Sequence, residues 1–366
     1  MYIKNFQIFK YRLPFVKTIN FNGNHLNFRS GLIIKINDEN GNIGYGEISP
    51  LPGFHIETIE TVIEQLLFLK QKLLGISLPP VKQVLNGVFQ NILKEFNIFP
   101  AVQCGLDFTI LNLLANKFNT PLYKLLSLKP NLLVPVNGLV TRLDQYTVNY
   151  IKTCLENGYN TFKIKVGRND IDMEIKSILE INTYFQGKVV LRLDANAKWE
   201  YDEAKYFLNS IKQVSSLEYI EEPLLDYSLI NKLYDDCKVP IGLDENLQMY
   251  ISRFHDLLYP LKAFVLKPPI IGGLNITMDL IKLATETNSS SVISDTFQSG
   301  IGLICLAALS TVVKNKTAMG LDTCNMIKND VLITKFCAHN GYVNVENVYS
   351  QICNVNFSNL NEIILN

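Results

Sequence analysis

The sequence has no excess charge of either sign and no apolar run long enough to cross a membrane. Thirty-four Lys and Arg residues balance 34 Asp and Glu residues. Without a basic field the chain would not attract nucleic acid or an anionic membrane surface, so we expect a small-molecule partner. No apolar run approaches the roughly 20 residues of a membrane-spanning helix, and the first residues lack the apolar segment of a signal peptide. The sequence therefore favours a cytoplasmic protein with neither a membrane nor a nucleic-acid partner.

Cysteine pairs with the spacing of a metal site are also missing. The seven cysteines are odd in number and scattered, and no CxxC pair occurs among them. This pattern argues against a zinc ribbon and a disulfide framework, and it indicates reduced, mostly buried thiols. Hydrophobic residues, in contrast, make up 48% of the 366 residues, which is enough for a large core.

The first part of the chain is expected to form an α+β domain over residues 1–127. Residues 1–48 are predicted to form antiparallel strands, with a hairpin at the Asn-Gly pair of the NDENG segment. Between the first strand and this hairpin, Phe15–Arg29 shows no clear period and predicts a mobile loop. Helical spacing follows in three segments: Ile56–Leu74, Val81–Phe96 and Pro100–Phe118.

Residues 128–325 change to an alternation of short apolar runs and helical patterns. The eight runs are VPVNGLV, TFKIKV, VVLRLD, LEYIE, PIGLD, AFVLK, SSVISD and AMGLD. Such alternation predicts a parallel sheet, and polar residues at the end of nearly every run favour closure into a barrel over an open sheet. The tail over residues 326–366 resumes two-residue alternation, and we expect it to return to the sheet of the first domain.

Charged residues stand at or near the ends of five of these runs. They are Lys165, Asp194, Glu221, Asp244 and Lys267. A parallel barrel gathers the C-terminal ends of its strands at one mouth, so these side chains would converge there. Three carboxylates on a rigid scaffold suit a hard cation, Mg²⁺ first and Mn²⁺ second, whereas zinc would want His or Cys. Salt bridges between the carboxylates and the barrel lysines are the alternative interpretation.

Two lysines, Lys163 and Lys165, stand two positions apart on one strand and therefore share a face. If that face is the barrel interior, repulsion between them and loss of solvent lower the pKa of a lysine, and a neutral amine can remove a proton. A solvent-facing pair is the alternative, but Lys267, expected across the barrel, favours the inward one. Together these groups predict abstraction of a proton α to a carboxylate, with a metal ion holding the enediolate.

The chain resembles the muconate-lactonising subgroup of the enolase superfamily over nearly its whole length. The matching motifs, in the family's order, are GEISPLPGF (Gly46–Phe54), TFKIKVG, LRLDAN, YIEEPL, GLDENL, VLKP, SDTFQSGIG (Ser294–Gly302) and GLDT (Gly320–Thr323). The resemblance implies an α/β fold, a (β/α)7β-type TIM barrel with an N-terminal α+β capping domain that the C-terminal tail completes. No motif position falls on any of the four histidines, so we assign chemistry to none of His25, His55, His255 and His339.

The resemblance also implies roles for the charged residues. Lys165 would remove the α-proton and return a proton to the departing hydroxide in a syn dehydration, as expected of lysine bases in this superfamily. Lys163 would help to hold the enolate and lower the pKa of Lys165, and Lys267 would stabilise the intermediate by a cation–π contact. The metal ligands would be Asp194, Glu221 and Asp244. The implied reaction is the Mg²⁺-dependent dehydration of a small carboxylate, 2-succinyl-6-hydroxy-2,4-cyclohexadiene-1-carboxylate, by a lyase of menaquinone biosynthesis.

Four further residues would contact the substrate by this resemblance: Arg192, Asn196, Ser299 and Gly300. Arg192 shares a strand face with Asp194, although a buried ion pair is the alternative for it. Ser299 and Gly300 stand where a helix is expected to begin, and backbone N–H groups at such a position can bind a carboxylate. A plain helix cap is the alternative there.

Other functions remain open on the same residues. The two opposed lysines would also serve 1,1-proton transfer in an N-acylamino acid racemase or a dipeptide epimerase. The segment GLDTCNM lacks the Asp-x-Asp with which related dipeptide epimerases bind a substrate ammonium group, which favours a substrate without a free amine. A catalytically silent barrel that acts as a binding or scaffold protein is a third hypothesis, and the intact set of charged residues argues against it. The sequence leaves open whether the chain forms a homo-oligomer.

Overall fold

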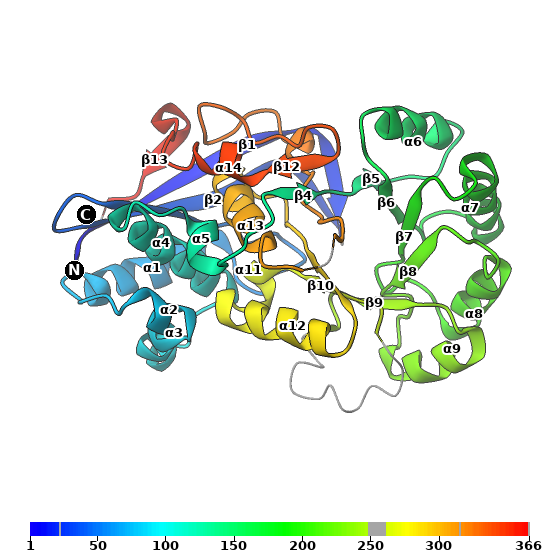
Figure 1. The fold of residues 1–366 in the computed structure, drawn as a ribbon, viewed down its shortest axis with the longest axis horizontal. Helices are drawn as coiled ribbons and strands as arrows, with labels where there is room; N and C mark the ends of the chain where they lie inside the picture. The colour runs from blue at the N-terminus through cyan, green and yellow to red at the C-terminus, as the bar shows by residue number, and fades with distance from the viewer. Residues whose placement is uncertain (22, 248–260, 315, 365–366) are drawn as a thin grey trace.

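The computed structural model describes residues 1–21, 23–247, 261–314 and 316–364, so His255 lies outside the described residues. Two parts can be followed in Figure 1, a cap built on a four-stranded antiparallel sheet and a barrel built on a seven-stranded parallel sheet. The cap sheet contains the blue N-terminal strands, and the green helices α6 to α9 lie on the outer side of the barrel strands next to them.

The cap sheet has the strand order β13-β1-β2-β3. The strand bounds are Ile3–Phe21 for β1, Asn24–Asp38 for β2, Ile43–Ile48 for β3 and Leu360–Glu362 for β13. β2 and β3 form the predicted hairpin, and the Asp38 carboxylate stabilises its turn by accepting hydrogen bonds from the N–H groups of Asn40 and Asn42 at 2.9 and 2.8 Å. β13 pairs with β1, so the C-terminal tail completes the cap sheet as predicted.

The prediction of a mobile loop over Phe15–Arg29 is wrong for the residues that the structure describes. They extend β1 and β2 into a long hairpin in which Ile19 pairs with Leu26. The register of this pairing shifts just before Ile19, which interrupts the two-residue alternation by which a strand is recognised in a sequence. Phe15 is buried and its ring lies edge-on to the ring of Phe297, with 5.7 Å between the centroids. Tertiary packing therefore holds the segment extended.

The helices of the cap begin after this sheet, and one predicted helix is divided. α1 (Ile59–Leu73) is capped by Thr58, whose hydroxyl accepts a hydrogen bond from the N–H of Thr61. The segment predicted as a single helix over 81–96 breaks at Gly87, which has a φ of 79°. It forms α2 (Val81–Leu85), α3 (Val88–Leu93) and the 3₁₀ turn η1 (Lys94–Phe96).

The long cap helix α4 (Pro100–Lys117) lies between the cap sheet and the barrel. It is buried over nearly its whole length, because it packs against β3, β2 and the barrel helix α11 (Pro268–Ile271). Two glycines of β3 allow the strand to approach α4 closely. A Cβ at Gly44 would collide with the backbone oxygen of Thr109, and a Cβ at Gly46 would collide with the Thr109 hydroxyl.

Seven parallel strands form most of the barrel wall, in the order β5 to β11. They are β5 (Gly138–Val140), β6 (Thr161–Lys165), β7 (Val190–Asp194), β8 (Leu217–Glu221), β9 (Ile241–Leu243), β10 (Ala263–Leu266) and β11 (Ser290–Ile293). The eighth predicted run closes the circle, because Met319 bridges to Val136 beside β5 and Gly320 bridges to Ser294 beside β11. The predicted fold class, a (β/α)7β-type barrel with an N-terminal cap, is confirmed.

Only part of the first predicted run belongs to the barrel. Its N-terminal half forms β4 (Leu133–Pro135), which pairs with β12 (Tyr342–Asn344) from the tail. Its C-terminal half is β5. The domain bounds at residues 127 and 325 stay predictions.

The remaining helices of the described chain connect the strands or pack around them. They are α5 (Leu122–Leu126), α6 (Thr147–Glu156), α7 (Ile171–Phe185), α8 (Tyr201–Ser210), η2 (Tyr227–Leu229), α9 (Ile230–Cys237), α12 (Leu274–Glu286), α13 (Gly300–Ser310), η4 (Cys324–Met326), α14 (Val345–Tyr349) and η5 (Phe357–Asn359). No helix in the described ranges is both long and apolar enough to cross a bilayer. All seven cysteines are free thiols.

Candidate active site

The two lysines of β6 point into the barrel. Along this strand Phe162 and Ile164 are fully buried in the hydrophobic core, and Lys163 and Lys165 alternate with them. Because successive side chains of a strand lie on opposite faces, both lysines line the inner face. The structure thus has the inward pair, and the solvent-facing alternative is not found.

The strand register brings the predicted residues into one layer at the barrel mouth. Lys165 is paired with Asp194, and Asp194 with Glu221. Asp244 and Lys267 directly follow β9 and β10, so they extend this layer around the mouth. All three carboxylates are at least 94% buried, with exposed fractions of 0%, 0% and 6% in chain order. The sequence therefore located a single cluster of charges from five different strands.

The lysines bind the carboxylates of this layer directly. Lys163 Nζ lies 2.6 Å from Glu221 Oε1 and 2.8 Å from Asp194 Oδ2. Lys165 Nζ lies 2.6 Å from the same Asp194 oxygen, and Lys267 forms an ion pair with Asp244. The salt bridges that the sequence analysis gave as an alternative are therefore present. They join the same side chains that the catalytic hypothesis requires at the barrel mouth.

The pKa values of the two lysines of β6 are shifted in opposite directions. Burial lowers the pKa of both, but for Lys163 the carboxylates of Asp194, Glu221 and Asp244 outweigh it and raise the pKa well above its ordinary value. For Lys165 burial dominates over attraction to Asp194, and the positive charge of Lys163 adds to it, so its pKa is lowered. Of the two, Lys165 is the one whose surroundings favour a neutral amine. This matches the role of base expected for it.

The carboxylates respond to the same charges. Burial would raise the pKa of Asp194, but Lys163 and Lys165 outweigh burial and lower it, so Asp194 stays ionised. Burial and the neighbouring charge of Asp194 raise the pKa of Glu221 well above its ordinary value. The site is thus short of positive charge around Glu221.

The donor set fits a hard divalent cation. In the described part of the chain no three His, Cys, Asp or Glu side chains surround a common point as they stand, because lysine ammonium groups lie between the carboxylates. Glu221 Oε2 is nevertheless buried without a hydrogen-bond partner among the described residues. Buried carboxylate oxygens are ligands that Mg²⁺ and Mn²⁺ favour, and an unpartnered one is costly unless a cation satisfies it. Asp194, Glu221 and Asp244 would hold that ion.

Asn196 connects the base to a further carboxylate. Its Oδ1 accepts a hydrogen bond from Lys165 Nζ at 2.9 Å, and its Nδ2 donates to Glu245 Oε1 at 3.2 Å. Glu222, which follows Glu221 in the chain, accepts hydrogen bonds from the backbone N–H groups of Asp244 and Asn246 at 2.7 and 2.9 Å. These contacts hold Lys165 and Asp244 in their positions at the mouth.

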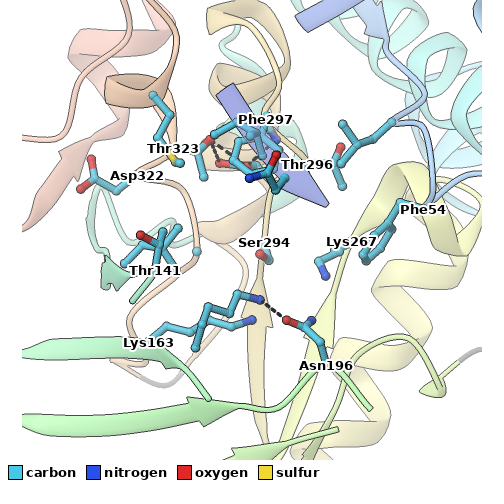
Figure 2. Close-up of a pocket in the computed structure, with 18 of the residues that line it drawn as sticks. Phe54, Thr141, Lys163, Asn196, Lys267, Ser294, Thr296, Phe297, Asp322 and Thr323 are labelled. Carbon is cyan, nitrogen blue, oxygen red and sulfur yellow. Dashed lines mark hydrogen bonds between the residues drawn. The ribbon is translucent and has the colours of Figure 1, made fainter. Parts of the chain in front are cut away.

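A cavity of about 360 Å³ opens above this layer. Its wall includes Lys163, Lys267 and Asn196 (Figure 2), together with Lys165, and all four were predicted for the site. The cap contributes residues 17–20 of β1 together with Leu51 and Phe54. The other lining residues come from the barrel, at or near the ends of β5, β6 and β11 and in the closing segment. The site is therefore built by both parts of the molecule.

Two predicted substrate contacts, Ser299 and Gly300, lie outside the cavity wall. The N–H of Ser299 donates to Glu47 Oε1 at 3.0 Å, and the N–H of Gly300 donates to Asp330 Oδ1 at 2.8 Å. Glu47 also accepts from the N–H of Gly302 at 2.9 Å. The start of α13 attracts carboxylates, as expected of a helix N-terminus, but the protein's own carboxylates fill it. Ser299 is the N-cap residue of α13, but its side chain makes no capping hydrogen bond. Contact of Ser299 and Gly300 with a substrate stays a prediction.

Arg192 also lies away from the cavity wall. It is paired in register with Lys163, one layer deeper than Asp194, and is almost fully buried. Its guanidinium donates to Glu218 Oε2 and to the backbone oxygen of Ala318, at 2.6 Å each. These two contacts hold the guanidinium in the layer below the cavity wall, so Arg192 is not part of the functional proposal as a substrate contact.

The cavity wall includes four charged residues to which the sequence analysis gave no role: Lys17, Arg168, Asp295 and Asp322. Both aspartates end predicted apolar runs, SSVISD and AMGLD, so the rule that selected Asp194 would have found them. Burial raises the pKa of Asp295 and of Asp322 to about 6 each. Thr323 donates to Asp295, and Tyr159 donates to Asp322 at 2.7 Å.

Comparison with known families agrees with this geometry. A family model described as "Enolase C-terminal domain-like" matches residues 147–348, more than half of the chain. A second model, described as "MenC, N-terminal domain", matches residues 3–111. The protein belongs to the enolase superfamily, the class that a capped barrel with a charged mouth defines. Its cap is of the kind that the second model describes.

The curated relatives include two different activities at similar identity. The chain is 25% identical over 346 residues to o-succinylbenzoate synthase of Pasteurella multocida, covering 90% of this chain and 92% of that protein. It is 26% identical over 313 residues to L-Ala-D/L-Glu epimerase of Bacillus subtilis, covering 82% of each. It is also 27% identical over 296 residues to Protein PHYLLO, chloroplastic, of Arabidopsis thaliana, covering 75% of this chain but spanning only 17% of that longer protein.

A solved structure shows the same fold. The dipeptide epimerase from Cytophaga hutchinsonii, solved with Mg and the dipeptide D-Ala-L-Val, superposes with a TM-score of 0.80 over 99% of both chains at 21% identity. At this identity the likeness establishes the fold alone.

Proposed function

We propose that the protein is an o-succinylbenzoate synthase, a Mg²⁺-dependent lyase of menaquinone biosynthesis. It would convert 2-succinyl-6-hydroxy-2,4-cyclohexadiene-1-carboxylate to o-succinylbenzoate and water. The observation that carries the proposal is the pair of lysines, Lys165 and Lys267, on different strands of one cavity with three buried carboxylates beneath them. The similarity of the whole chain to the Pasteurella synthase and of its cap to the MenC model supports this reaction.

Lys165 is the base in this proposal. Its neutral amine takes the proton from the ring carbon that bears the carboxylate, and the electron pair of that C–H bond is delocalised onto this carboxylate until it forms the new ring double bond in the second step. The C–O bond to the ring hydroxyl then breaks, and the proton returns from Lys165 to the departing oxygen, so that water leaves. The product ring is aromatic, which favours the second step. Asn196 holds the amine by its hydrogen bond at 2.9 Å.

The other charges at the mouth stabilise the negative charge that the first step creates. Magnesium, or manganese, held by Asp194, Glu221 and Asp244, would neutralise charge on the substrate carboxylate when the proton leaves. Lys163 is held in its charged form by two of these carboxylates, at 2.6 and 2.8 Å, and adds a fixed positive charge beside Lys165. Lys267 presents a second ammonium group from β10.

A second function, epimerisation of dipeptides or racemisation of N-acylamino acids, is supported by a specific feature. Asp295 and Asp322 place two carboxylates on the cavity wall, and such groups can bind a substrate ammonium. The Bacillus epimerase is as similar in identity as the Pasteurella synthase. Thr323 and Tyr159 already donate hydrogen bonds to these aspartates, which leaves them less free for an ammonium group. We therefore place this function second.

A direct assay separates the two functions. The purified protein is given the cyclohexadiene substrate, and formation of o-succinylbenzoate is followed by absorbance, with Mg²⁺ and after EDTA treatment. L-Ala-L-Glu and an N-acylamino acid are tested in parallel for exchange of the α-proton with deuterated water. Rapid, metal-dependent aromatisation with slow exchange supports the synthase. Fast exchange of the dipeptide without aromatisation would make the second function the correct one.

A further inference from the structure

The cavity contains more positive charge than the reaction needs. Five cationic side chains line it: Lys17, Lys163, Lys165, Arg168 and Lys267. Three of them are bound to the carboxylates at the barrel mouth. Within the described part of the chain neither Lys17 nor Arg168 has a carboxylate partner, and both are exposed to solvent. Two cations of the cavity wall are therefore left over for a ligand.

These two cations come from different parts of the molecule. Lys17 belongs to cap strand β1, next to Thr18 and Ile19, which also line the cavity. Arg168 follows barrel strand β6 by three residues, and its guanidinium donates a long hydrogen bond, 3.3 Å, to the backbone oxygen of Thr141. That contact uses one of five N–H donors and fixes the side chain at the cavity wall, so the others stay available.

The acidic residues of the cavity do not neutralise Lys17 and Arg168. Asp322 accepts from Tyr159 at 2.7 Å, and Asp295 accepts from Thr323 at 2.9 and 2.8 Å. The start of α13, the other group suited to an anion, is filled by Glu47 and Asp330. For an anionic group that enters the cavity, Lys17 and Arg168 are therefore the cations that no carboxylate of the described residues already binds.

We propose that Lys17 and Arg168 form a subsite for a second carboxylate, the one at the end of the succinyl chain, and so select a dicarboxylic acid over a monocarboxylic acid. This inference rests on the proposed synthase function. It assigns binding residues to the part of the substrate that the reacting groups do not contact. Arg168 can hold a carboxylate through two N–H donors, and Lys17 adds a point charge from the cap. Because Lys17 lies on the cap and Arg168 on the barrel, a dicarboxylate would also bind the two parts together.

The test compares two ligands that differ in the second carboxylate alone. Dissociation constants are measured by calorimetry, with Mg²⁺ and at fixed ionic strength, for o-succinylbenzoate and for 2-butyrylbenzoate, in which a methyl group replaces that carboxylate. The wild type should prefer the diacid, and Lys17→Ala or Arg168→Ala should each weaken diacid binding by about fivefold to tenfold while monoacid binding stays the same. In turnover the variants should raise KM with a much smaller change in kcat, because the distal contact is equal in the ground and transition states.

Two charge-matched variants serve as controls. Lys4→Ala lies on the same strand as Lys17, and Lys176→Ala lies on α7 near Arg168 in the chain; both positions are exposed and outside the cavity wall. Neither should change the preference for the diacid. Equal losses for both ligands in the Lys17 and Arg168 variants, or a retained preference, would overturn the subsite. A wild type that aromatises its substrate but binds both ligands equally refutes the subsite alone, whereas a wild type without aromatisation refutes the synthase function.

Discussion

The ammonium nitrogen of Lys267 lies 4.3 Å from the centroid of the Phe54 ring. Lys267 directly follows the barrel strand β10, and Phe54 stands on the loop that follows cap strand β3, so this contact joins the two parts at the site (Figure 2). An aromatic face attracts a cation and keeps water from it. The cap loop therefore positions one of the two opposed lysines as well as covering the cavity.

Replacing Phe54 should slow turnover without unfolding the protein. In Phe54→Leu the cation–π contact is lost, which should reduce kcat by about twofold to thirtyfold, while Phe54→Tyr should keep most of the rate. Steady-state kinetics with a thermal unfolding curve measures both quantities. The surface pair Phe68 and Lys72 has the same chemistry, with 5.6 Å between the nitrogen and the ring centroid, so Phe68→Leu is the matched control and should leave kcat unchanged. An equal loss in both variants would disprove the special role of Phe54.

Removing either opposed lysine should abolish measurable dehydration. Lys165→Ala removes the base and Lys267→Ala the opposing ammonium group, and each loss is expected to be on the order of 10²- to 10⁴-fold. Both variants should still fold and bind Mg²⁺, as shown by circular dichroism and by calorimetry with the metal. Lys205→Ala, which breaks a surface ion pair with Asp236, controls for the loss of a charge. Undiminished turnover in Lys165→Ala would remove the acid–base role from that residue.

The Glu47 carboxylate should be a major contributor to stability. It accepts hydrogen bonds from the N–H groups of Ser299 and Gly302 at 3.0 and 2.9 Å and from the Tyr11 hydroxyl at 2.6 Å. In Glu47→Gln an amide NH₂ would face these donors, so the free energy of unfolding should fall by about 2 to 3 kcal/mol in urea denaturation. Glu60→Gln, in the first turn of α1, should change it by less than about 0.5 kcal/mol. Similar values for the two variants would contradict this account.

The stability of the protein should decrease between about pH 4 and pH 6 through Asp107. Burial raises the pKa of this carboxyl from 3.8 to about 6, despite hydrogen bonds from Leu274 and Gln103. A folded-state pKa above the unfolded one means that the folded protein binds the extra proton, so this stabilisation is present below pH 4 and is lost as the pH rises through 6. The loss amounts to about 3 kcal/mol.

Asp107→Asn isolates this contribution. The amide does not titrate, so the difference in unfolding free energy between wild type and variant should change across this pH range and stay constant above it. Asp295 and Asp322 also have pKa values raised to about 6, but they titrate in both proteins and cancel in the comparison. Urea denaturation at several pH values measures the difference, and parallel curves for the two proteins would show that Asp107 does not titrate there.

Much of the site could be predicted because the rule that locates it is local. Apolar runs with period two, each ended by a polar residue, identify β6 to β10, and parallel strands bring their C-terminal ends together. This reasoning brought together Lys165 and Lys267, which line one cavity, and Asp194, which binds Lys165 beneath it. The hairpin at Asp38 and the return of the tail to the cap sheet could be predicted for the same reason.

The sequence was a poorer guide where distant residues decide the outcome. The segment is extended because β1 and β2 pair on both sides of a register shift and Phe15, which lies within the shift, packs on Phe297, and a local pattern shows neither contact. The N–H groups of Ser299 and Gly300 were correctly placed at a helix start, but carboxylates 252 and 30 residues away fill them.

By itself, the sequence determined which side chains gather at the barrel mouth, because strand periodicity and chain direction fix them. Only the tertiary structure decided which further cations line the cavity, and which of its cations are already bound by carboxylates. Lys163 and Lys267 are held by carboxylates of other strands, whereas Lys17 and Arg168 have none among the described residues. Pairing depends on distances of a few ångströms between elements far apart in the chain, and no local pattern encodes them.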